Sequence, residues 1–477
     1  MAFLIGGANS AADTGYNVAN SCRWNDDDKP RLYKSNGTPT SRRKFTYSVW
    51  LKRASLDAEA DLHMMFDIQG NSNRFYVAFF GDKLRVNGTK SGDGTTALDI
   101  KTNRIFRDFS AWYHICVAVD TEQGTAADRI KIYVNGTLET SFANASYPDE
   151  DEDLAVNESN VEIGNHIDYD NQHYDGYMAE VVFIDGSQEA VTSFGEFNED
   201  SPRIWQPINV SGLTFGTNGF YLDFEDSSNL GNDKNGGTDF TEDDIIAVDQ
   251  CTDTPTNSFC TLNPLDGGVV NTSLEEGNCK INSTGDSSWG YWASTFHLST
   301  GKWYWEVKMI TGSAAWFLGV VESENPNWIH LATSYINDTH GGYGIYKDGR
   351  KNEGTTAALA TYMAAYSGDD IISFALDLDA NRLYVAKNGS WADGSGNNDE
   401  ASPNAFLDLT SGLIVSNPAS WKIVFNMDDN CDCEINFGNP PYANSSDAAD
   451  ADGYGAFEYA PPSGYFSLCT KNLAEYG

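Results

Sequence analysis

The sequence predicts an all-β protein with two antiparallel β-sandwich (jelly-roll) domains joined by a connector rich in Gly, Asn and Asp. Three observations support this fold class. The 477 residues are enough for two sandwiches of roughly 200–250 residues each. Aromatic residues make up 13% of the chain, and glycines number 44. Stretches with sustained helical periodicity are absent, so many short strands joined by tight turns are expected.

The first sandwich is expected at residues 1–186, where short apolar runs alternate with turn residues. Within the run 112–120 both faces are largely apolar, which is typical of an internal strand. We interpret His114 in this run as a packed, hydrogen-bonded core histidine rather than a base or a ligand. Asn135 and Gly136 indicate a two-residue hairpin turn. The runs that predict strands are "FTYSVWLKR", "RFYVAFFGDKLRV", "AWYHICVAVD", "RIKIYVNGTLETSF" and "GYMAEVVFIDG".

Residues 187–266 are expected to form the connector, because the alternation is lost there and Gly, Asn, Asp and Pro accumulate. The stretch "GFYLDFED" is strand-like, and Phe220 and Tyr221 can anchor the connector on a neighbouring sandwich.

Three aspartates of the connector, Asp223, Asp226 and Asp233, are candidate calcium ligands. They supply hard oxygen atoms, and the nearby glycines permit a tight loop. Their spacing does not match an EF-hand, and ordinary turns closed by Asp side chains explain the same residues. Calcium therefore stays open, and no other cofactor is expected.

The second sandwich is expected at residues 267–477. In "GKWYWEV", Trp303 and Trp305 alternate with Tyr304 and Glu306, which predicts a half-buried strand. A sandwich core explains such alternating aromatics better than a binding platform does. The other strand-like runs are "WFLGVV", "GYGIYKDG", "DIISFALDLDANRLYVAKNGSW", "WKIVFNM" and "CEINFG".

The charge and the cysteines exclude several classes of function. Thirty basic and sixty-nine acidic residues give a net charge of −39, which opposes binding to nucleic acids and to anionic membranes. The eight cysteines form no CxxC pair and no zinc spacing, so buried thiols are expected. A disulfide between Cys251 and Cys260 is left open. "MAFLIGGANS" lacks a basic region, and no apolar run reaches membrane length, so we expect neither a signal peptide nor a membrane span.

Each of the two blocks of the chain resembles a known family. "STGKWYWEV", "YGIYKDGRKNEG", "DIISFALDLDANRLYVAKNGS" and "INFG" occur in the order found in the SPRY family, which the second block resembles. The first block is similar to a laminin-G-like, concanavalin A-like jelly roll through "TYSVWLKR", "WYHICVAVD", "DRIKIYVNGTLETSF" and "DGYMAEVVFIDG". Both resemblances imply antiparallel sandwiches and assign no catalytic residue.

The chain as a whole resembles virion proteins of marine bacteriophages. "FGEFNEDSPRIWQP", "GTNGFYLDFEDSSNLGNDKNGG", "DTPTNSFCTLNPLD" and "PPSGYFSLCTKNL" carry this resemblance. It implies a tail fibre or surface appendage that attaches to a host-surface glycan or protein, made in the host cytoplasm and located in the virion. Other virion proteins and further copies of the chain, as in a trimer, are the implied partners. The alternative is a purely architectural tail or capsid decoration protein.

We expect no enzymatic activity. Glucanases on the concanavalin-type fold carry Glu-x-Asp-x-x-Glu on one strand, which points carboxylates into one cleft, and this sequence lacks that triplet. Gly-x-Ser-x-Gly, phosphate-loop and His-Glu-x-x-His motifs are also missing. A glycan-degrading enzyme is the less favoured hypothesis.

Two loop segments are candidate ligand-binding sites, because exposed aromatic rings stack on sugars while Asp, Asn or His side chains bind their hydroxyl groups. Subunit contact or loop packing is the alternative for both. Trp391 is a weaker candidate. The first segment contributes His166, Tyr169, Asp170, His173 and Tyr174, and the second contributes Trp328, His330, Tyr335 and His340.

Overall fold

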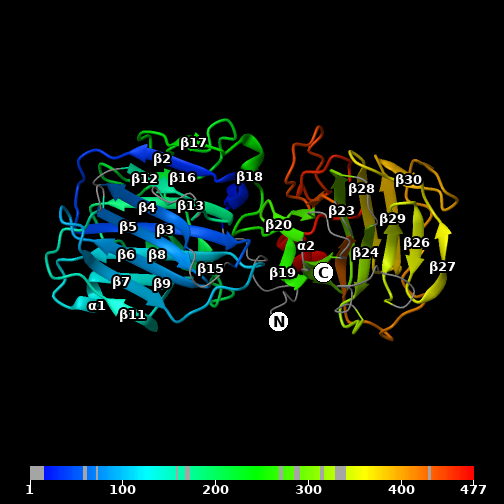
Figure 1. Cartoon of the computed structure of the whole chain (residues 1–477), viewed down its shortest axis with the longest axis horizontal. Helices are drawn as coiled ribbons and strands as arrows, with labels where there is room; N and C mark the ends of the chain where they lie inside the picture. The colour runs from blue at the N-terminus through cyan, green and yellow to red at the C-terminus, as the bar shows by residue number, and fades with distance from the viewer. Residues whose placement is uncertain are drawn as a thin grey trace. The chain divides into compact units, whose positions relative to one another are not determined.

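The computed structural model describes residues 15–56, 62–70, 73–156, 160–166, 172–267, 272–283, 290–311, 316–327, 340–427 and 431–477. Within these ranges strands dominate, and the α-helices α1 (Ala126–Arg129) and α2 (Thr470–Tyr476) are short (Figure 1). The all-β prediction is confirmed. The chain divides into a first unit that ends at Thr256 and a second unit that begins at Asn257.

The described part of the first unit is a sandwich of two antiparallel sheets. One sheet has the order β10-β9-β8-β3-β13-β1-β18, with β16 also paired to β13. Its strands are β1 (Ser21–Trp24), β3 (Lys44–Arg53), β8 (Tyr113–Asp120), β9 (Ile130–Val134), β10 (Thr137–Leu138), β13 (Gly176–Asp185), β16 (Phe220–Leu222) and β18 (Gln250–Cys251).

The facing sheet has the order β11-β7-β6-β5-β4-β12-β2-β17. Its strands are β2 (Arg31–Ser35), β4 (Leu62–Gly70), β5 (Asn73–Phe80), β6 (Lys83–Thr89), β7 (Thr96–Thr102), β11 (Phe142–Ser146), β12 (Asn160–Ile163) and β17 (Thr241–Asp243). Aromatic rings fill the space between the sheets: Phe66 stacks on Tyr47 at 4.6 Å and on Phe183 at 5.3 Å. Tyr47 and Phe183 lie in runs that the sequence predicted to be strands, whereas β4, which carries Phe66, was not among the predicted runs.

The expected connector is largely a part of the first unit. Its strands β16, β17 and β18 extend the two sheets. Before them in the chain, β14 (Gly195–Phe197) and β15 (Trp205–Pro207) pair as a separate two-stranded hairpin. Phe194, Trp205 and Tyr221 belong to a buried cluster that also contains Trp50 of β3, so this segment covers an outer face of the sandwich. Burial of these large rings explains why the segment is ordered rather than a free linker.

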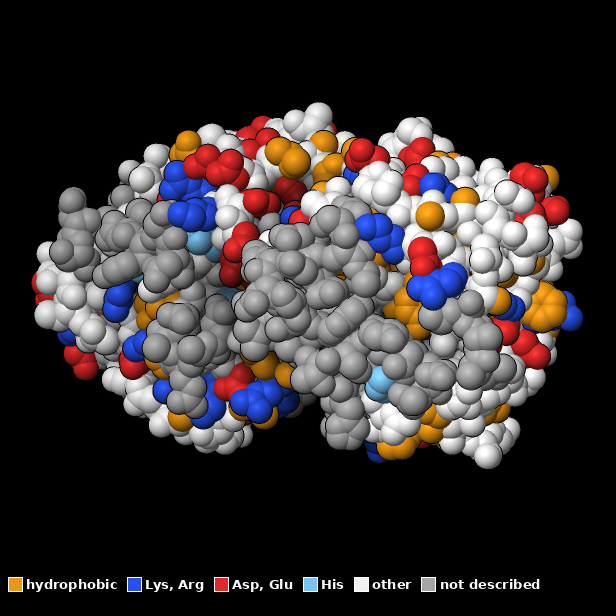
Figure 2. Space-filling model, turned by 45° about the vertical axis from the view of Figure 1, so that its right-hand side comes forward, with side chains coloured by type: hydrophobic (Ala, Val, Ile, Leu, Met, Phe, Trp, Pro, Cys, Tyr) orange, Lys and Arg blue, Asp and Glu red, His pale blue; other side chains and the backbone are white. Residues whose placement is uncertain are grey.

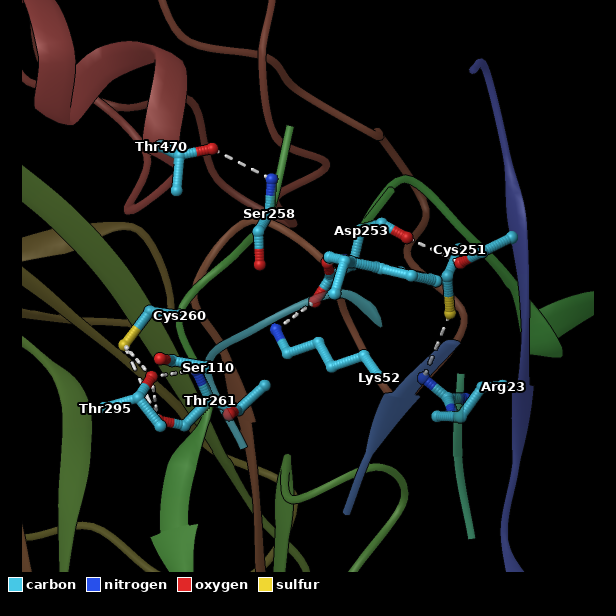
Figure 3. A network of polar contacts seen from close by, with 12 residues as sticks. Arg23, Lys52, Ser110, Cys251, Asp253, Ser258, Cys260, Thr261, Thr295 and Thr470 are labelled. Atoms are coloured by element: carbon cyan, nitrogen blue, oxygen red, sulfur yellow. Dashed lines mark hydrogen bonds and ion pairs between the residues drawn. The ribbon is translucent and has the colours of Figure 1, made fainter. Parts of the chain in front are cut away.

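A buried ion pair fastens the end of the first unit to its sheet (Figure 3). The ammonium of Lys52 on β3 lies 2.7 Å from Oδ2 of Asp253, and both side chains are at most 1% exposed. The indole of Trp112 donates a hydrogen bond to the other carboxylate oxygen of Asp253 at 2.9 Å. Two donors therefore compensate the burial of this carboxylate.

The second unit contains another pair of antiparallel sheets in its described residues. One has the order β19-β22-β33-β24-β25-β26-β27, formed by β19 (Leu262–Gly267), β22 (Gly290–Leu298), β24 (Trp316–Glu322), β25 (Tyr343–Tyr346), β26 (Arg350–Glu353), β27 (Thr356–Thr361) and β33 (Trp421–Met427). The other has the order β20-β21-β34-β23-β28-β29-β30-β31, with β32 also paired to β29. Its strands are β20 (Thr272–Glu275), β21 (Lys280–Ser283), β23 (Lys302–Met309), β28 (Ile371–Asp377), β29 (Arg382–Lys387), β30 (Ser390–Ala392), β31 (Asn398–Glu400), β32 (Leu407–Asp408) and β34 (Cys433–Asn436).

Strand β23 is buried on both faces, whereas the sequence predicted a half-buried strand. Trp303 and Trp305 lie in the core as expected, and Trp305 stacks on Phe374 at 5.0 Å. On the opposite face Tyr304 packs against Phe457 at 4.9 Å, and Glu306 is fully buried. The segment that contains Phe457 therefore covers this face, which a local alternation pattern cannot reveal.

Candidate functional site

The second unit holds a pocket with a volume of about 390 Å³, within the roughly 300–1,000 Å³ range of small-molecule sites. Three aromatic rings form its walls, and charged side chains stand on the turn beside them. The lining residues are Trp316, Tyr346, Lys347, Asp348, Arg350, Ala365 and Tyr366.

A tight hairpin turn builds one side of the pocket. Strand β25 ends at Tyr346 and β26 begins at Arg350, so the intervening residues reverse the chain. Gly349 has a φ of 80°, and its carbonyl accepts hydrogen bonds from the N–H groups of Tyr362 and Met363 at 2.9 and 3.1 Å. A Cβ atom at Gly349 would lie 2.0 Å from the carbonyl oxygen of Met363. Glycine therefore lets the turn pack closely on the neighbouring loop.

The three aromatic walls are packed rather than loose. Trp316 begins β24 and is 1% exposed, and its ring lies 6.5 Å from that of Tyr366 at an angle of 49°. Tyr346 is 8% exposed and contacts Phe317 edge to face at 5.5 Å. The N–H of Tyr366 donates to the carbonyl of Lys347 at 3.0 Å, which holds the loop against the turn. Because these rings are held by packing, the pocket is formed before a ligand arrives.

Two buried donors in the pocket walls have no acceptor in the described structure. They are the indole nitrogen Nε1 of Trp316 and the hydroxyl of Tyr366. Burial raises the pKa of Tyr366 well above its ordinary value of 10, so the hydroxyl keeps its proton. Other buried side chains share this state, among them Trp292 and Trp305 of the same unit, so these two donors do not by themselves mark a ligand site.

The charged residues of the turn are arranged around Asp348. Nε of Arg350 donates to Oδ2 of Asp348 at 2.5 Å, and the backbone N–H of Arg350 donates to Oδ1 at 3.2 Å. The side chains of Arg350 and Asp348 are 43% and 50% exposed. This side of the pocket is therefore polar and open to water, while the aromatic walls are buried.

The first predicted loop is buried where the structure describes it. Tyr174 is fully buried, and its hydroxyl donates to the carbonyl of Lys52 at 3.0 Å, so its ring offers no face to a ligand. His166 is 2% exposed, with Nδ1 3.6 Å from Oδ2 of Asp67, and His173 is 7% exposed. Tyr169 and Asp170 lie outside the described residues. Packing thus accounts for the described side chains of this loop.

Most of the second predicted loop lies outside the described residues. Trp328, His330 and Tyr335 fall there, so their role as ligand contacts stays a prediction. His340 is described and partly exposed, and its carbonyl accepts a hydrogen bond from Asn325 at 2.7 Å. Trp391, the weaker candidate, is 7% exposed.

The three candidate calcium ligands have partners within the first unit. Asp223 lies 2.8 Å from the ammonium of Lys234. Oδ1 of Asp226 accepts hydrogen bonds from the N–H and the hydroxyl of Ser228 at 3.0 and 2.6 Å. Oδ1 of Asp233 accepts the N–H groups of Tyr221 and Asn235 at 3.0 and 3.1 Å. In the described residues no group of three His, Cys, Asp or Glu side chains is placed to hold a metal ion. Calcium binding stays an open alternative to the ordinary turns that the sequence indicates.

The eight cysteines are buried, as the sequence predicted. Cys251 belongs to the first unit and Cys260 to the second. Both carry thiols in this structure, and no disulfide joins them.

Burial raises the pKa of several described carboxyl groups, among them Glu180 and Glu306. Burial raises the pKa of Glu180 to about 7, and that of Glu306 to about 6. Glu180 accepts hydrogen bonds from the hydroxyls of Tyr221 and Tyr16 at 2.8 and 3.0 Å. Glu306 accepts the N–H groups of Glu458 and Tyr459 at 2.9 and 2.8 Å. Neither lines the pocket, and protein donors surround both, so each is better explained as a structural carboxyl group than as an acid or base.

Sequence reasoning missed the pocket, although part of its signal was visible. The run "YKDGR" places an aromatic residue and three charges on a glycine turn, a pattern that indicates an exposed, chemically mixed surface. Trp316 and Tyr366 are distant from this run in sequence, and each looks like a core residue there. Only the fold brings the three rings together.

A family model matches part of the first unit. Residues 27–190 match the laminin-G-type family model described as the concanavalin A-like lectin/glucanases superfamily, which supports the resemblance of the first sandwich. The pocket lies outside this range. None of the curated proteins matches the sequence significantly.

Several solved structures share parts of the fold at low similarity. The SPRY domain of human HERC1 is 15% identical, with a TM-score of 0.26, over 36% of this chain and 96% of that domain. Another human SPRY domain is 13% identical, with a TM-score of 0.25, over 37% of this chain and 99% of that domain. The heptameric SAP-like pentraxin of Limulus polyphemus is 14% identical, with a TM-score of 0.26, over 37% of this chain and 81% of that one. Similarity at this level defines neither a ligand nor an activity.

Proposed function

We propose that this protein is a non-enzymatic glycan-binding protein and that the pocket of the second unit is its binding site. The observation that carries the proposal is the combination of aromatic walls with the exposed, charged turn of Asp348 and Arg350 in one pocket. Sugars present apolar ring faces that stack on aromatic side chains, and their hydroxyl groups form hydrogen bonds with polar side chains. A bound sugar would meet both kinds of group in this pocket.

A binding role also agrees with the match of the first unit to a superfamily model that includes lectins. That superfamily includes glucanases as well, so the absence of catalysis is part of the proposal. It is supported by the missing carboxylate triplet in the sequence and by the engagement of Glu180 and Glu306 with protein donors.

The biological setting that we propose is attachment of a bacteriophage particle to its host. It rests on the sequence resemblance to marine virion proteins and makes the chain a tail fibre or surface appendage. The described residues contain no helix long and apolar enough to cross a membrane. Purified protein added to host cells before the phage should reduce adsorption in proportion to dose. If folded protein at saturating concentration leaves adsorption unchanged, a purely architectural role replaces the adhesive one.

The binding site itself is tested on an array of bacterial and algal glycans. Wild-type protein should bind a subset of them, and Tyr346→Leu should weaken that binding at least tenfold, because it keeps apolar volume but removes the stacking face. Trp316→Phe should weaken binding less than Tyr346→Leu does, because it keeps an aromatic ring in the wall of the pocket.

Tyr384→Leu provides the matched control for Tyr346→Leu. Tyr384 lies in the same unit, is 7% exposed and contacts Phe406 edge to face at 5.9 Å, yet does not line the pocket. Its substitution should leave glycan binding intact. Equal loss in both variants would show a general effect on folding, and no binding by wild-type protein would contradict the proposal.

A further inference from the structure

We infer that the pocket selects a sugar that bears a carboxylate, a uronic acid, and that Arg350 recognises this carboxylate. The inference rests on the proposed glycan-binding function and specifies the class of sugar. It is carried by the arrangement of the guanidinium at the pocket.

Arg350 is held in place by one edge of its guanidinium only. Nε donates to Asp348, and Asp348 is in turn fixed by the backbone N–H of Arg350. The described structure gives the two terminal nitrogens of Arg350 no acceptor. A guanidinium that is already oriented, with both terminal nitrogens available, matches the planar, two-oxygen geometry of a carboxylate.

The position of Arg350 suits a ligand that also stacks on the aromatic wall. Its guanidinium carbon lies over the Tyr346 ring, 6.0 Å from the ring centre, so a ligand that reaches the exposed part of this ring also meets the guanidinium. A pyranose ring on Tyr346 would carry its exocyclic C6 group outward from the ring, which is where a uronic acid holds its carboxylate. The same ligand can therefore stack on the Tyr346 ring and bind the Arg350 guanidinium through its carboxylate.

The charged residues of the pocket lining are of both signs, in contrast to the strongly acidic chain. They are Lys347, Asp348 and Arg350, whereas the whole chain carries −39. Acidic and basic side chains are interspersed over the described surface in view (Figure 2), so the negative charge is not gathered in one place there. Because the Debye length is about 8 Å at physiological salt, the nearest charges determine binding of a small anion.

The test uses pairs of methyl glycosides that differ only at C6: glucose and glucuronate, galactose and galacturonate, mannose and mannuronate. Binding to the full-length protein is measured by ligand-detected NMR and titration calorimetry at 0.15 M salt. At least one uronate should bind about tenfold tighter than its neutral partner, the difference expected for a hydrogen bond to a charged group. Arg350→Gln should remove this preference, so that the uronate loses more affinity than its neutral partner and the ratio of the two affinities falls to about one.

Arg382→Gln is the matched control, because Arg382 also lies over an aromatic ring, 4.3 Å from the centre of Phe406, in the same unit but outside the pocket. It should keep the uronate preference. Equal affinity for the two members of every pair would overturn this inference and leave the proposed function standing. Absence of binding by all six sugars and by the glycan array would overturn both. An acidic peptide that binds through Arg350 while no uronate does would assign the carboxylate to a protein partner and contradict the sugar inference.

Discussion

The indole N–H of Trp205 donates a hydrogen bond to Nδ1 of His114 at 3.0 Å inside the first unit. Nδ1 is therefore an acceptor, so the proton of the neutral ring is on Nε2, which lies 2.8 Å from the hydroxyl of Ser48. Burial lowers the pKa of His114 to about 3. A protonated ring would also place its Nδ1–H against the indole N–H. His114 is thus a neutral structural residue, as the sequence predicted.

Substitution of Trp205 by Phe should destabilise the first unit by about 1–3 kcal/mol beyond the loss of ring volume, because it leaves Nδ1 of buried His114 without its donor. Urea unfolding of the full chain, followed by fluorescence, measures the free energy. Trp24→Phe is the matched control: Trp24 is fully buried in the same unit, and its Nε1 has no acceptor in the described structure. Equal losses in the two variants would contradict a contribution from the hydrogen bond.

The strands of both sandwiches were predictable because a sheet buries alternate side chains. Local turns were also readable: Asn135 and Gly136 have φ values of 47° and 71°, as a two-residue hairpin turn requires. Asn388 and Gly389 repeat this geometry with 49° and 79°. Each of these features depends on a few consecutive residues.

What covers the outer faces of the sheets could not be predicted. Tyr304 and Glu306 look solvent-facing in sequence, but a segment about 150 residues later buries them, with N–H donors from Glu458 and Tyr459. Likewise, residues 187–256 are rich in Gly and Asp, which is typical of a loop, yet aromatic rings of this segment pack on the first sandwich. Such contacts depend on the path of the chain between distant elements. The pocket was missed for the same reason.

Glu180 should make the first unit less stable as the pH rises. Burial raises its folded-state pKa from 4.5 to about 7, so the native state binds more protons than the unfolded state between these values. Its contribution is fully present below about pH 4.5 and lost as the pH passes 7, a change of up to about 3 kcal/mol. Glu180→Gln should abolish this part of the pH dependence in urea unfolding, and it should be the more stable protein at pH 8. The exposed Glu199→Gln is the control, and an unchanged pH profile in Glu180→Gln would rule the mechanism out.

The ion pair of Lys52 and Asp253 should be far more sensitive to substitution than a surface pair. Asp253→Asn removes the negative charge beside a buried ammonium, and the expected cost is about 3–5 kcal/mol. The control, Asp153→Asn, breaks an ion pair of 2.6 Å whose Arg43 and Asp153 side chains are 36% and 53% exposed, and it should cost at most about 1 kcal/mol. Chemical denaturation of both variants gives the comparison. Similar costs would mean that the buried pair does not fasten the end of the first unit.

Gly349→Ala should abolish ligand binding at the pocket while the two sandwiches remain folded. The new methyl group would meet the carbonyl oxygen of Met363 at 2.0 Å, so the turn that carries Lys347, Asp348 and Arg350 must move away from its loop. Glycan binding and near-ultraviolet circular dichroism are measured together.

Gly453→Ala is a matched control, because Gly453 has a φ of 81° in the same unit and no neighbour within 4 Å of its would-be Cβ. It introduces the same left-handed strain, about 1–2 kcal/mol, without the clash. If both variants bind normally, the turn does not shape the binding site, and the assignment of the pocket fails.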